Sequence, residues 1–544
     1  MKTLKKRVSG FSDLNGRVGL NLKFFSERWS GAMTQTIYDL IEAQGDSDVA
    51  IDMPRSEAAG RTPLNYESLK SLINDVHTDL NTFGIGRNDR VAIVLPNGPY
   101  MASAFVSVAC SATTAPLNPA YGQQEFEFYL EDLNARAIIL AEDEAGPVVG
   151  VAQKLGIPVL RLVPNSGGPV GAFRLFSEAA RNGERAATTG FAAPADTALV
   201  LHTSGTTSRP KIVPLSHENV TASALHIGST LKLTSNDRCL NIMPLFHIHG
   251  LIAAVLSSLA AGASVSCAPG FNALKAFGWL EEVDPTWYTA VPTMHQAILG
   301  RAPRNQEIVD KLRLRLIRSS SSSLPPQVMT ALEETFGAPV IESYGMTEAA
   351  HQMASNPLPP AIRKPGFVGI AAGPEVAIMD NKGILLSAGE IGEVVIRGPN
   401  VTKGYENNPD ANATAFSNGW FRTGDQGTID GEGYLRLTGR LKEIINRGGE
   451  KVSPLEVDEV IMDHPAVAQC VTFAMPHKSL GEEVAAAVVL REGQEASEAD
   501  IRQFLRERLA DYKIPRKVLI LEEIPKGATG KLQRIGLAEK LGLA

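Results

Sequence analysis

Short apolar segments alternate with longer amphipathic patterns in the N-terminal part of the chain. Residues 90–97, 135–143 and 198–205 are short apolar runs that end in polar or turn-forming residues. Runs of this kind predict buried strands, and the amphipathic segments between them predict helices. Because strands that alternate with helices usually form parallel sheets covered by helices, we expect an α/β fold with parallel layers here.

Two later segments have the strict apolar–polar alternation of half-buried strands. They are residues 392–400 and 433–440, and glycine-rich turns lie between them. This pattern predicts a more twisted, β-barrel-like part after the α/β layers.

The pattern changes after Arg440, which indicates a domain boundary. Apolar segments follow at residues 457–467 and 485–490, and Ser497 stands three residues before Asp500, as in a capping box. Apolar residues then recur at helical spacing. We therefore expect a small α+β domain of about a hundred residues at the C-terminus.

The composition narrows the class of protein. The 544 residues are 44% hydrophobic and 20% charged, which is typical of a globular protein with at least two domains. The net charge of -7 lacks the basic excess of nucleic-acid or anionic-membrane binding, so we expect neither partner. The charge-free residues 244–272 contain polar side chains and predict a buried helix and turn, not a membrane span. The oligomeric state stays open.

The cysteines indicate the compartment. Cys110, Cys239, Cys267 and Cys470 are far apart and form no C-x-x-C pair, so neither a zinc site nor a disulfide framework is expected. A reducing, cytoplasmic location fits this pattern best.

Residues 1–32 form a basic N-terminal extension. They carry seven lysines or arginines against Asp13 and Glu27, as a weak organelle-targeting segment would. We favour a tail or a misassigned start, because Met33 opens a segment that looks like a natural domain start.

A loop rich in hydroxyl groups, HTSGTTSRPK at residues 202–211, follows one predicted strand. Backbone N–H groups and hydroxyls of such a loop can surround phosphate oxygens, and a terminal lysine adds positive charge. The candidate phosphate-binding residues are Thr203, Ser204, Gly205, Thr206, Thr207 and Lys211. By composition alone a surface turn is the alternative, whereas a Walker A loop is excluded because its second glycine and G-K-[ST] ending are absent.

Four further motifs follow in a fixed order. They are ESYGMTE at residues 342–348, WFRTGD at 420–425, GRLKEIINRGGEKVSPLEVD at 439–458 and PKGATGK at 525–531. With the hydroxyl-rich loop, they resemble the adenylate-forming superfamily of acyl-CoA synthetases, nonribosomal adenylation domains and luciferases. The resemblance covers nearly everything from Met33 onward.

The resemblance implies a domain organisation and a reaction. Residues 33–441 would form the AMP-binding adenylation domain and residues 443–544 a mobile lid, with a hinge at Lys442. Such an enzyme uses ATP and Mg²⁺ to convert a carboxylic acid to an acyl-adenylate, and then transfers the acyl group to a thiol. Because the chain ends 13 residues after Lys531, we expect free coenzyme A as the acceptor, not a carrier domain.

The resemblance also assigns the nucleotide pocket. Tyr344 would stack on adenine beside the serine run, and Asp425 would accept hydrogen bonds from the ribose hydroxyls with Arg440 assisting. The serine run then becomes a pocket wall, whereas its composition alone suggests a linker. The other expected nucleotide-binding residues are Ser321, Ser322, Ser323, Glu342, Ser343, Gly345, Met346 and Thr347.

Catalytic and hinge residues follow in the same way. Glu348 and Thr206 would hold Mg²⁺, since a hard cation prefers oxygen ligands, and Lys531 would reach the α-phosphate. His247 is expected near the reacting carboxylate. Gly448 and Gly449 would line the path of the thiol, although an ordinary tight turn there is the simpler alternative.

The identity of the acid rests on departures from the common superfamily pattern. Ser208 and Arg209 replace a usual Gly-x pair, and Ile212 stands where glycine is usual. The S-R-P-K variant and residues 244–251, 286–296 and 346–360 look most like the oxalyl-CoA synthetase group. Ile212 departs even from that group, and its effect on loop closure stays open.

Oxalate needs polar partners for its second carboxylate inside a closed pocket. We expect Ser321 and His351 to contact that carboxylate, with a packing role for His351 as the alternative. Rival functions are a coumarate-type, medium-chain or malonate CoA ligase, although no motif position obviously supplies the arginine that a longer diacid would need. A nucleotide-binding homologue without turnover is a distant alternative.

Overall fold

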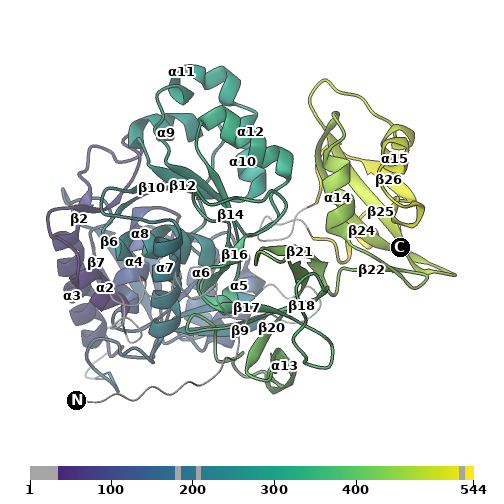
Figure 1. The fold of residues 1–544 in the computed structure, drawn as a ribbon. Helices are drawn as coiled ribbons and strands as arrows, with labels where there is room; N and C mark the ends of the chain where they lie inside the picture. Colours follow the sequence, from purple (N-terminus) through teal and green to yellow (C-terminus); the bar gives the residue numbers. More distant parts are fainter. Residues whose placement is uncertain (1–34, 178–185, 204–209, 526–532) are drawn as a thin grey trace, which may run out of the picture.

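The computed structural model describes residues 35–177, 186–203, 210–525 and 533–544. Within them the chain forms four sheets, two in the N-terminal layers, one in a β-rich part and one near the C-terminus (Figure 1). The expected architecture of parallel α/β layers, a β-rich part and a small C-terminal α+β unit is confirmed.

The first sheet contains the three strands predicted from short apolar runs. Its seven strands are ordered β7-β6-β5-β3-β4-β8-β9, and the neighbours from β6 to β8 are parallel. Their bounds are β3 Arg90–Val94, β4 Thr113–Pro116, β5 Ala137–Ala141, β6 Val159–Pro164, β7 Phe173–Ser177, β8 Thr197–Thr203 and β9 Lys211–Ser216. Strand β9 returns antiparallel to β8 and so closes the hydroxyl-rich loop.

The second sheet has nine strands in the order β16-β15-β14-β13-β12-β10-β11-β1-β2, parallel from β14 to β1. Their bounds are β1 Val49–Asp52, β2 Leu64–Asn65, β10 Arg238–Asn241, β11 Ser264–Cys267, β12 Trp287–Ala290, β13 Leu316–Ser319, β14 Val340–Met346, β15 His351–Ser355 and β16 Ile370–Ala371. The parallel run brings the ends of β13 and β14 to one edge, where several motif residues lie.

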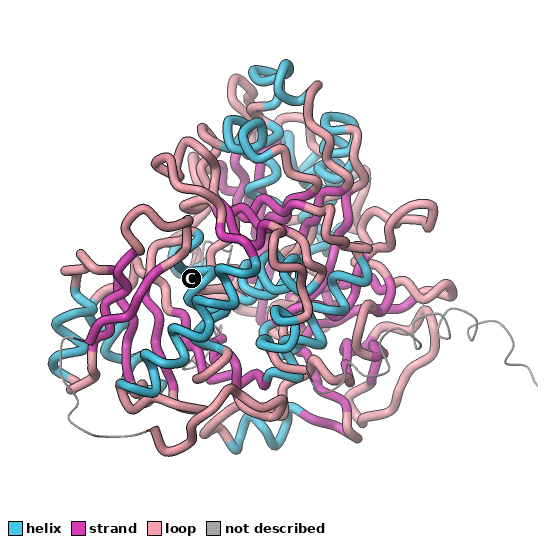
Figure 2. Tube along the Cα trace, turned by 90° about the vertical axis from the view of Figure 1, so that its left-hand side faces the viewer, coloured by secondary structure: helices cyan, strands magenta, loops and turns pink. Residues whose placement is uncertain are grey.

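Helices fill the space between these two sheets and cover their outer faces (Figures 1 and 2). The largest core cluster combines side chains of both sheets with α2 Ile37–Glu42, α3 Tyr66–Thr82, α4 Pro99–Ala109, α7 His217–Thr230, the π-helix η2 His249–Leu256 and α8 Ser257–Ala260. The outer helices are α5 Gln123–Leu133 and α6 Pro147–Lys154 on one side, and α9 Ala276–Val283, α10 Pro292–Leu299, α11 Gln306–Val309 and α12 Pro326–Phe336 on the other.

The β-rich part contains the two later segments predicted as strands. Its strands are β17 Glu375–Met379, β18 Gly392–Arg397, β19 Phe416–Ser417, β20 Trp420–Ile429 and β21 Leu435–Arg440, with α13 Pro409–Ala415 beside them. All of its strand pairs are antiparallel, as expected for a twisted β region.

The last sheet starts after Arg440. Its strands are β22 Ile445–Arg447, β23 Glu450–Val452, β24 Val467–His477, β25 Gly481–Leu490 and β26 Lys517–Ile520, and its helices are α14 Pro454–Met462, α15 Glu498–Arg506 and α16 Leu537–Lys540. Ser497 and Asp500 form the predicted capping box of α15. The helix is stabilised because each side chain binds a backbone N–H of the other residue.

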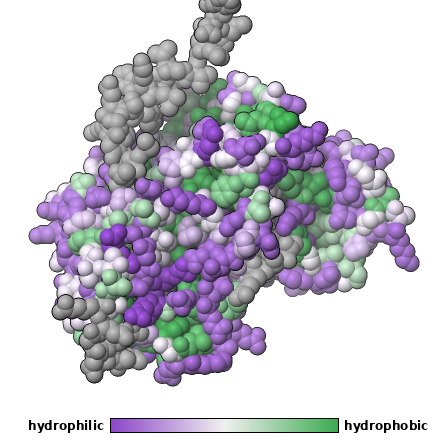
Figure 3. Space-filling model, turned by 90° about the horizontal axis from the view of Figure 1, so that it is seen from below, coloured by the Kyte–Doolittle hydropathy of each residue, from purple (hydrophilic) through white to green (hydrophobic). Residues whose placement is uncertain are grey.

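The helical part of the charge-free segment is buried, as predicted. The π-helix η2 and α8 belong to it, and every residue of both helices is buried. Among the described residues, no helix combines the length and the apolar composition needed to cross a bilayer. The face seen in Figure 3 is mostly hydrophilic, with hydrophobic areas that are separate from one another.

Candidate active site

The motif residues gather where β13 and β14 end. These neighbours are parallel, and Ser319 at the end of β13 is aligned with Glu342 in β14. The carboxyl ends of parallel strands are the usual place for ligands in open α/β sheets. The edge of this sheet therefore forms one rigid side of the site, and the β-rich part adds further side chains.

The hydroxyl-rich loop lies between β8 and β9. Thr203 and Lys211 are aligned across its base, while Ser204, Gly205, Thr206 and Thr207 lie outside the described residues. The Lys211 ammonium lies 4.3 Å from the ring centre of Tyr405. This cation–π contact holds a positive charge at the base of the loop.

Glu348 is a buried carboxylate next to this cation. The Tyr405 hydroxyl donates a 2.8 Å hydrogen bond to Glu348 Oε1, and the Thr402 backbone N–H donates to the Glu348 carbonyl at 2.7 Å. Burial raises the pKa of Glu348, although the hydrogen bond from Tyr405 opposes this shift. A buried carboxylate that is costly to ionise alone fits a site for a hard divalent cation, which would supply the missing positive charge.

Tyr344, Asp425 and Arg440 come from three different strands and meet in one cluster. The Tyr344 hydroxyl donates a 2.5 Å hydrogen bond to Asp425 Oδ2, and Arg440 Nε lies 3.1 Å from Asp425 Oδ1. Burial raises the pKa of Asp425, and the Arg440 guanidinium opposes this rise. The structure thus brings together the three residues expected at adenine and ribose.

The serine run continues from β13 and is fixed to β14. Ser320 Oγ donates to the Ser343 carbonyl at 2.8 Å, and the Leu324 N–H donates to Glu342 Oε1 at 2.9 Å. Burial raises the pKa of Glu342 to about 8. These contacts make the run part of the sheet edge, not a linker. Ser322 and Ser323 expose their side chains, and Ser321 is half-buried with a φ of 73°.

Two histidines pack against each other, and one of them contacts the serine run. His351 is buried at the start of β15, and its carbonyl oxygen would be only 1.8 Å from a Cβ on Gly345, so glycine is required there. The sequence did not single out His249, yet its Nδ1 lies 3.0 Å from Ser321 Oγ and its ring centre 4.9 Å from that of His351. His247 is half-buried and its ring lies against Phe246.

Arg318 was also missed from the sequence. No motif position seemed to supply an arginine for a diacid pocket, but the structure places the fully buried Arg318 directly against both His249 and His351. The available signal was weak, because Arg318 is the last of three arginines, Arg313, Arg315 and Arg318, that lie close together just before the serine run. The lack of an arginine therefore no longer disfavours a longer diacid.

The expected hinge lies between the β-rich part and the last sheet, and the expected thiol residues lie in a turn of that last sheet. Lys442 is exposed and follows β21. Gly448 and Gly449 have φ values of 60° and 102° in the turn from β22 to β23, which favours glycine at both positions. Beyond Lys531, which lies outside the described residues, Arg534 forms an ion pair with Asp458 at 2.7 Å.

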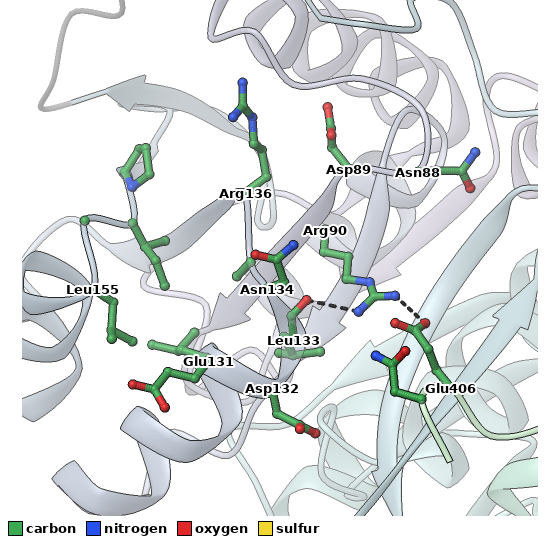
Figure 4. A pocket seen from close by; sticks show the side chains of 16 residues that line it. Asn88, Asp89, Arg90, Glu131, Asp132, Leu133, Asn134, Arg136, Leu155 and Glu406 are labelled. Atoms are coloured by element: carbon green, nitrogen blue, oxygen red, sulfur yellow. Dashed lines mark hydrogen bonds and ion pairs between the residues drawn. The ribbon is translucent and has the colours of Figure 1, made fainter. Parts of the chain in front are cut away.

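A surface cavity of about 740 Å³ lies elsewhere, at the end of α5 (Figure 4). Arg90 points into it, forms an ion pair with Glu406 and donates to the Leu133 carbonyl at 3.0 Å. None of the motif residues expected at the active site lines this cavity. We therefore place the candidate active site at the strand ends.

The comparisons with known proteins agree with this geometry. Residues 42–406 match the model of the family described as AMP-binding enzyme, and residues 456–531 match the AMP-binding enzyme C-terminal domain. The chain is 45% identical to an oxalate–CoA ligase of Arabidopsis thaliana and 40% identical to one of Saccharomyces cerevisiae. These alignments cover 88% and 90% of this chain and 93% and 94% of the relatives.

A curated relative and a solved structure extend this agreement. A probable CoA ligase, CCL9, of Humulus lupulus is 46% identical over 88% of this chain and 92% of its own. The ATP-bound crystal structure of MatB from Rhodopseudomonas palustris superposes with a TM-score of 0.82 at 30% identity, covering 93% of this chain and 98% of that one.

Proposed function

The chain belongs to the AMP-binding enzyme family, and we propose that it is the member that activates oxalate. It is an AMP-forming acid–CoA ligase that uses ATP, Mg²⁺ and coenzyme A. The proposed reaction converts oxalate, ATP and coenzyme A to oxalyl-CoA, AMP and diphosphate.

One observation of the structure carries the choice of oxalate. At the sheet edge where the site residues meet, the buried His249 and His351 form a polar cluster with the half-buried Ser321. A second carboxylate leaves water only if such hydrogen-bonding groups receive it. A fatty or aromatic acid would instead need an apolar surface. The proposed contacts are Ser321 and His351 at the distal carboxylate and His247 at the reacting one.

The nucleotide would occupy the other side of the same edge. In this proposal Tyr344 lies against adenine, and Asp425 exchanges its hydrogen bond from Tyr344 for the ribose hydroxyls, with Arg440 retained beside it. The further residues proposed along the nucleotide are Thr203, Ser204, Gly205, Thr207, Lys211, Ser322, Ser323, Glu342, Ser343, Gly345, Met346 and Thr347. The fixed position of the serine run against β14 supports this arrangement.

The chemistry needs positioning and charge neutralisation, not a protein nucleophile. A carboxylate oxygen of the acid forms the new bond to the α-phosphorus, and the bond from that phosphorus to diphosphate breaks. Lys531 is proposed to neutralise the charge that builds on the α-phosphate. Glu348 and Thr206 would hold Mg²⁺, which supplies positive charge to the triphosphate.

The second step requires the small domain to move. We propose the organisation already expected from the sequence, with residues 33–441 as the adenylation domain, residues 443–544 as the lid and a hinge at Lys442. The exposed position of Lys442 between β21 and β22 supports it. Gly448 and Gly449 would then border the path of the thiol, which attacks the acyl carbon while AMP leaves.

The location and the second candidate follow from other observations. All four cysteines are buried and free, which supports a reducing compartment such as the cytoplasm. Malonate is the second candidate acid, because the buried Arg318 could serve a longer diacid.

The test is AMP release by the purified protein with ATP, Mg²⁺ and coenzyme A, using oxalate, malonate, acetate, octanoate or 4-coumarate. We expect oxalate to give the highest kcat/KM by at least about 100-fold over acetate, because acetate leaves the polar cluster unpaired. Preference for octanoate or 4-coumarate would contradict the assignment to a small diacid.

A further inference from the structure

We propose that Arg318 is the positioning residue that makes this pocket selective for a dianionic acid. The inference rests on the proposed function and deepens it, because it names the source of the selectivity. Arg318 lies behind His249 and His351, and His249 in turn contacts Ser321 of the serine run.

Arg318 is a buried cation without an anionic partner. Its side chain is fully buried in β13, its Nε has no hydrogen-bond partner, and no carboxylate among the described residues forms an ion pair with it. Burial lowers its pKa to about 9, so it still carries its charge at neutral pH. A buried charge without a counter-ion is unfavourable. A second substrate carboxylate nearby would supply the missing negative charge.

Three neutral acceptors hold the guanidinium in place. Its Nη1 lies 3.5 Å from His249 Nε2 and 3.3 Å from His351 Nε2, and its Nη2 donates to Gln352 Oε1 at 3.3 Å. The Gln352 amide is oriented by its own Nε2, which donates to Thr230 Oγ1 and to the Ala372 carbonyl. The guanidinium is therefore fixed at the back of both imidazole rings.

This contact sets the protonation of His249. A guanidinium only donates, so the Nε2 atom that it faces must be an acceptor. The Thr289 hydroxyl lies 2.6 Å from the same Nε2 and also donates to it. The remaining proton of the neutral ring is then on Nδ1, which lies 3.0 Å from Ser321 Oγ and donates to it. The Ser321 hydroxyl proton is left to donate to an incoming carboxylate.

The same reasoning applies to His351. Its Nε2 faces Arg318 as an acceptor, so its neutral ring carries the proton on Nδ1, on the side of Gly345. The pocket thus presents hydrogen-bond donors with a fixed positive charge behind them. A dianion gains from both the donors and the charge, whereas an isosteric monoanion gains less from the charge.

Oxamate provides the matched probe, because it replaces one carboxylate of oxalate by an amide of nearly the same shape. The measurement is kcat and KM of the full-length enzyme for oxalate and for oxamate, in the wild type and in three variants. Arg318→Met and Arg318→Gln remove the charge, and Gln retains a donor. Arg318→Lys keeps the charge, so it tests rescue.

We define the selectivity ratio as kcat/KM for oxalate divided by kcat/KM for oxamate. The Arg318→Met and Arg318→Gln variants should lower this ratio by about 10-fold to 100-fold. The fall should come mainly from a higher KM for oxalate, because the charge acts on the bound dianion. The Arg318→Lys variant should recover most of the wild-type ratio. Stabilisation by ATP in thermal unfolding shows which variants are folded. If the Arg318→Met variant does not fold, the Arg318→Gln variant provides the same comparison. An unchanged ratio in a folded Arg318→Met or Arg318→Gln variant would overturn the role of Arg318. A ratio in the Arg318→Lys variant no higher than that in the Arg318→Met variant would overturn it as well.

Thr289→Val is the matched control for the hydrogen bond alone. It removes one donor to His249 without changing the charge, so kcat/KM should fall for oxalate and oxamate alike, and their ratio should stay within about 3-fold. A fall in the ratio as large as that of Arg318→Met would show that hydrogen bonding, not charge, gives the selectivity.

The two proposals can fail separately. A wild-type enzyme that prefers malonate would overturn the oxalate assignment, and the pair malonate and malonamate would then test Arg318 in the same way. A wild-type enzyme that does not distinguish a diacid from its monoamide would overturn both.

Discussion

Single buried carboxylates and cations dominate the candidate site. Glu348, Asp425 and Glu342 all have a pKa that burial raises, and each lies within a short chain of hydrogen bonds. Such shifts cluster at sites where a ligand supplies the opposite charge. Glu342 differs from the other two carboxylates, because its Oε1 accepts a hydrogen bond from the Leu324 N–H and so holds the end of the serine run in place. Arg440 is not a partner of Glu342.

The pKa of Glu342 predicts a pH dependence of stability. Its folded-state pKa of about 8 lies above the ordinary value of 4.5, so the folded state binds the proton more tightly than the unfolded state. The resulting stabilisation is full below the ordinary pKa and is lost as pH rises through about 8. Glu342→Gln mimics the protonated form and keeps an acceptor for Leu324.

We therefore expect Glu342→Gln to gain about 1 kcal/mol or more relative to wild type between about pH 5.5 and about pH 8.5. Thermal unfolding of both proteins across this range measures it. The exposed Glu307→Gln is the control and should show no trend. A constant difference between Glu342→Gln and wild type would mean that Glu342 is ionised at both pH values.

At the residue scale, the recognised motifs indicated residues that the structure places close together. The structure joins Tyr344, Asp425 and Arg440 although more than 80 positions separate the first two. Arg318 belongs to no motif that was recognised, and His249 was given no role within residues 244–251. The contact between the two arises only when η2 packs against β13. A sequence pattern cannot show which polar residue of an apolar segment faces another element.

At the scale of elements, hydrophobic period predicted the strands well. The runs at residues 90–97 and 135–143 became β3 and β5, and the helix after Ser497 starts at its capping box. The π-helix η2 was not predicted beyond a buried helix. An almost wholly apolar segment gives no periodic signal that separates π from α geometry.

The approach of β14 to β15 gives a prediction about two glycines. A Cβ on Gly345 would lie 1.8 Å from the His351 carbonyl oxygen, whereas a Cβ on Gly278 in α9 would meet nothing within 4 Å. We expect Gly345→Ala to destabilise the protein by at least about 2 kcal/mol. Gly278→Ala should stabilise it by about 0.5 to 1 kcal/mol.

Denaturant unfolding of the two variants measures both effects, and AMP release reports on the site. Gly345→Ala should also lose most activity, since the shift displaces His351. A Gly345→Ala protein as stable and active as Gly278→Ala would show that β14 and β15 are not packed this closely.

At the scale of the whole molecule, two domains are needed to complete the proposed site. Glu348 and Asp425 lie before the proposed hinge, and Lys531 lies after it. The sequence predicted both units, because the hydrophobic pattern changes at Arg440. The angle between the units depends on contacts such as the Arg436–Glu459 ion pair, which no local pattern encodes.

This arrangement predicts the effect of removing the lid lysine. Lys531→Ala should lower oxalate-dependent AMP formation by about 10²-fold to 10³-fold, because one cation at the transferring phosphoryl group is lost. ATP affinity, measured by calorimetry, should change little. Lys540→Ala near the C-terminus is the control with an exposed lysine. Full activity of Lys531→Ala would remove this residue from the mechanism.

The most direct test of the central claim follows the oxygen atoms of the acid. The enzyme is supplied with unlabelled ATP, unlabelled coenzyme A and oxalate that carries ¹⁸O at every oxygen. The masses of the products are then measured by mass spectrometry. If the carboxylate attacks the α-phosphorus and the thiol then displaces AMP, each AMP carries one ¹⁸O and each oxalyl-CoA keeps the other three labelled oxygens. Unlabelled AMP, or the formation of ADP, would contradict an oxalyl-adenylate intermediate.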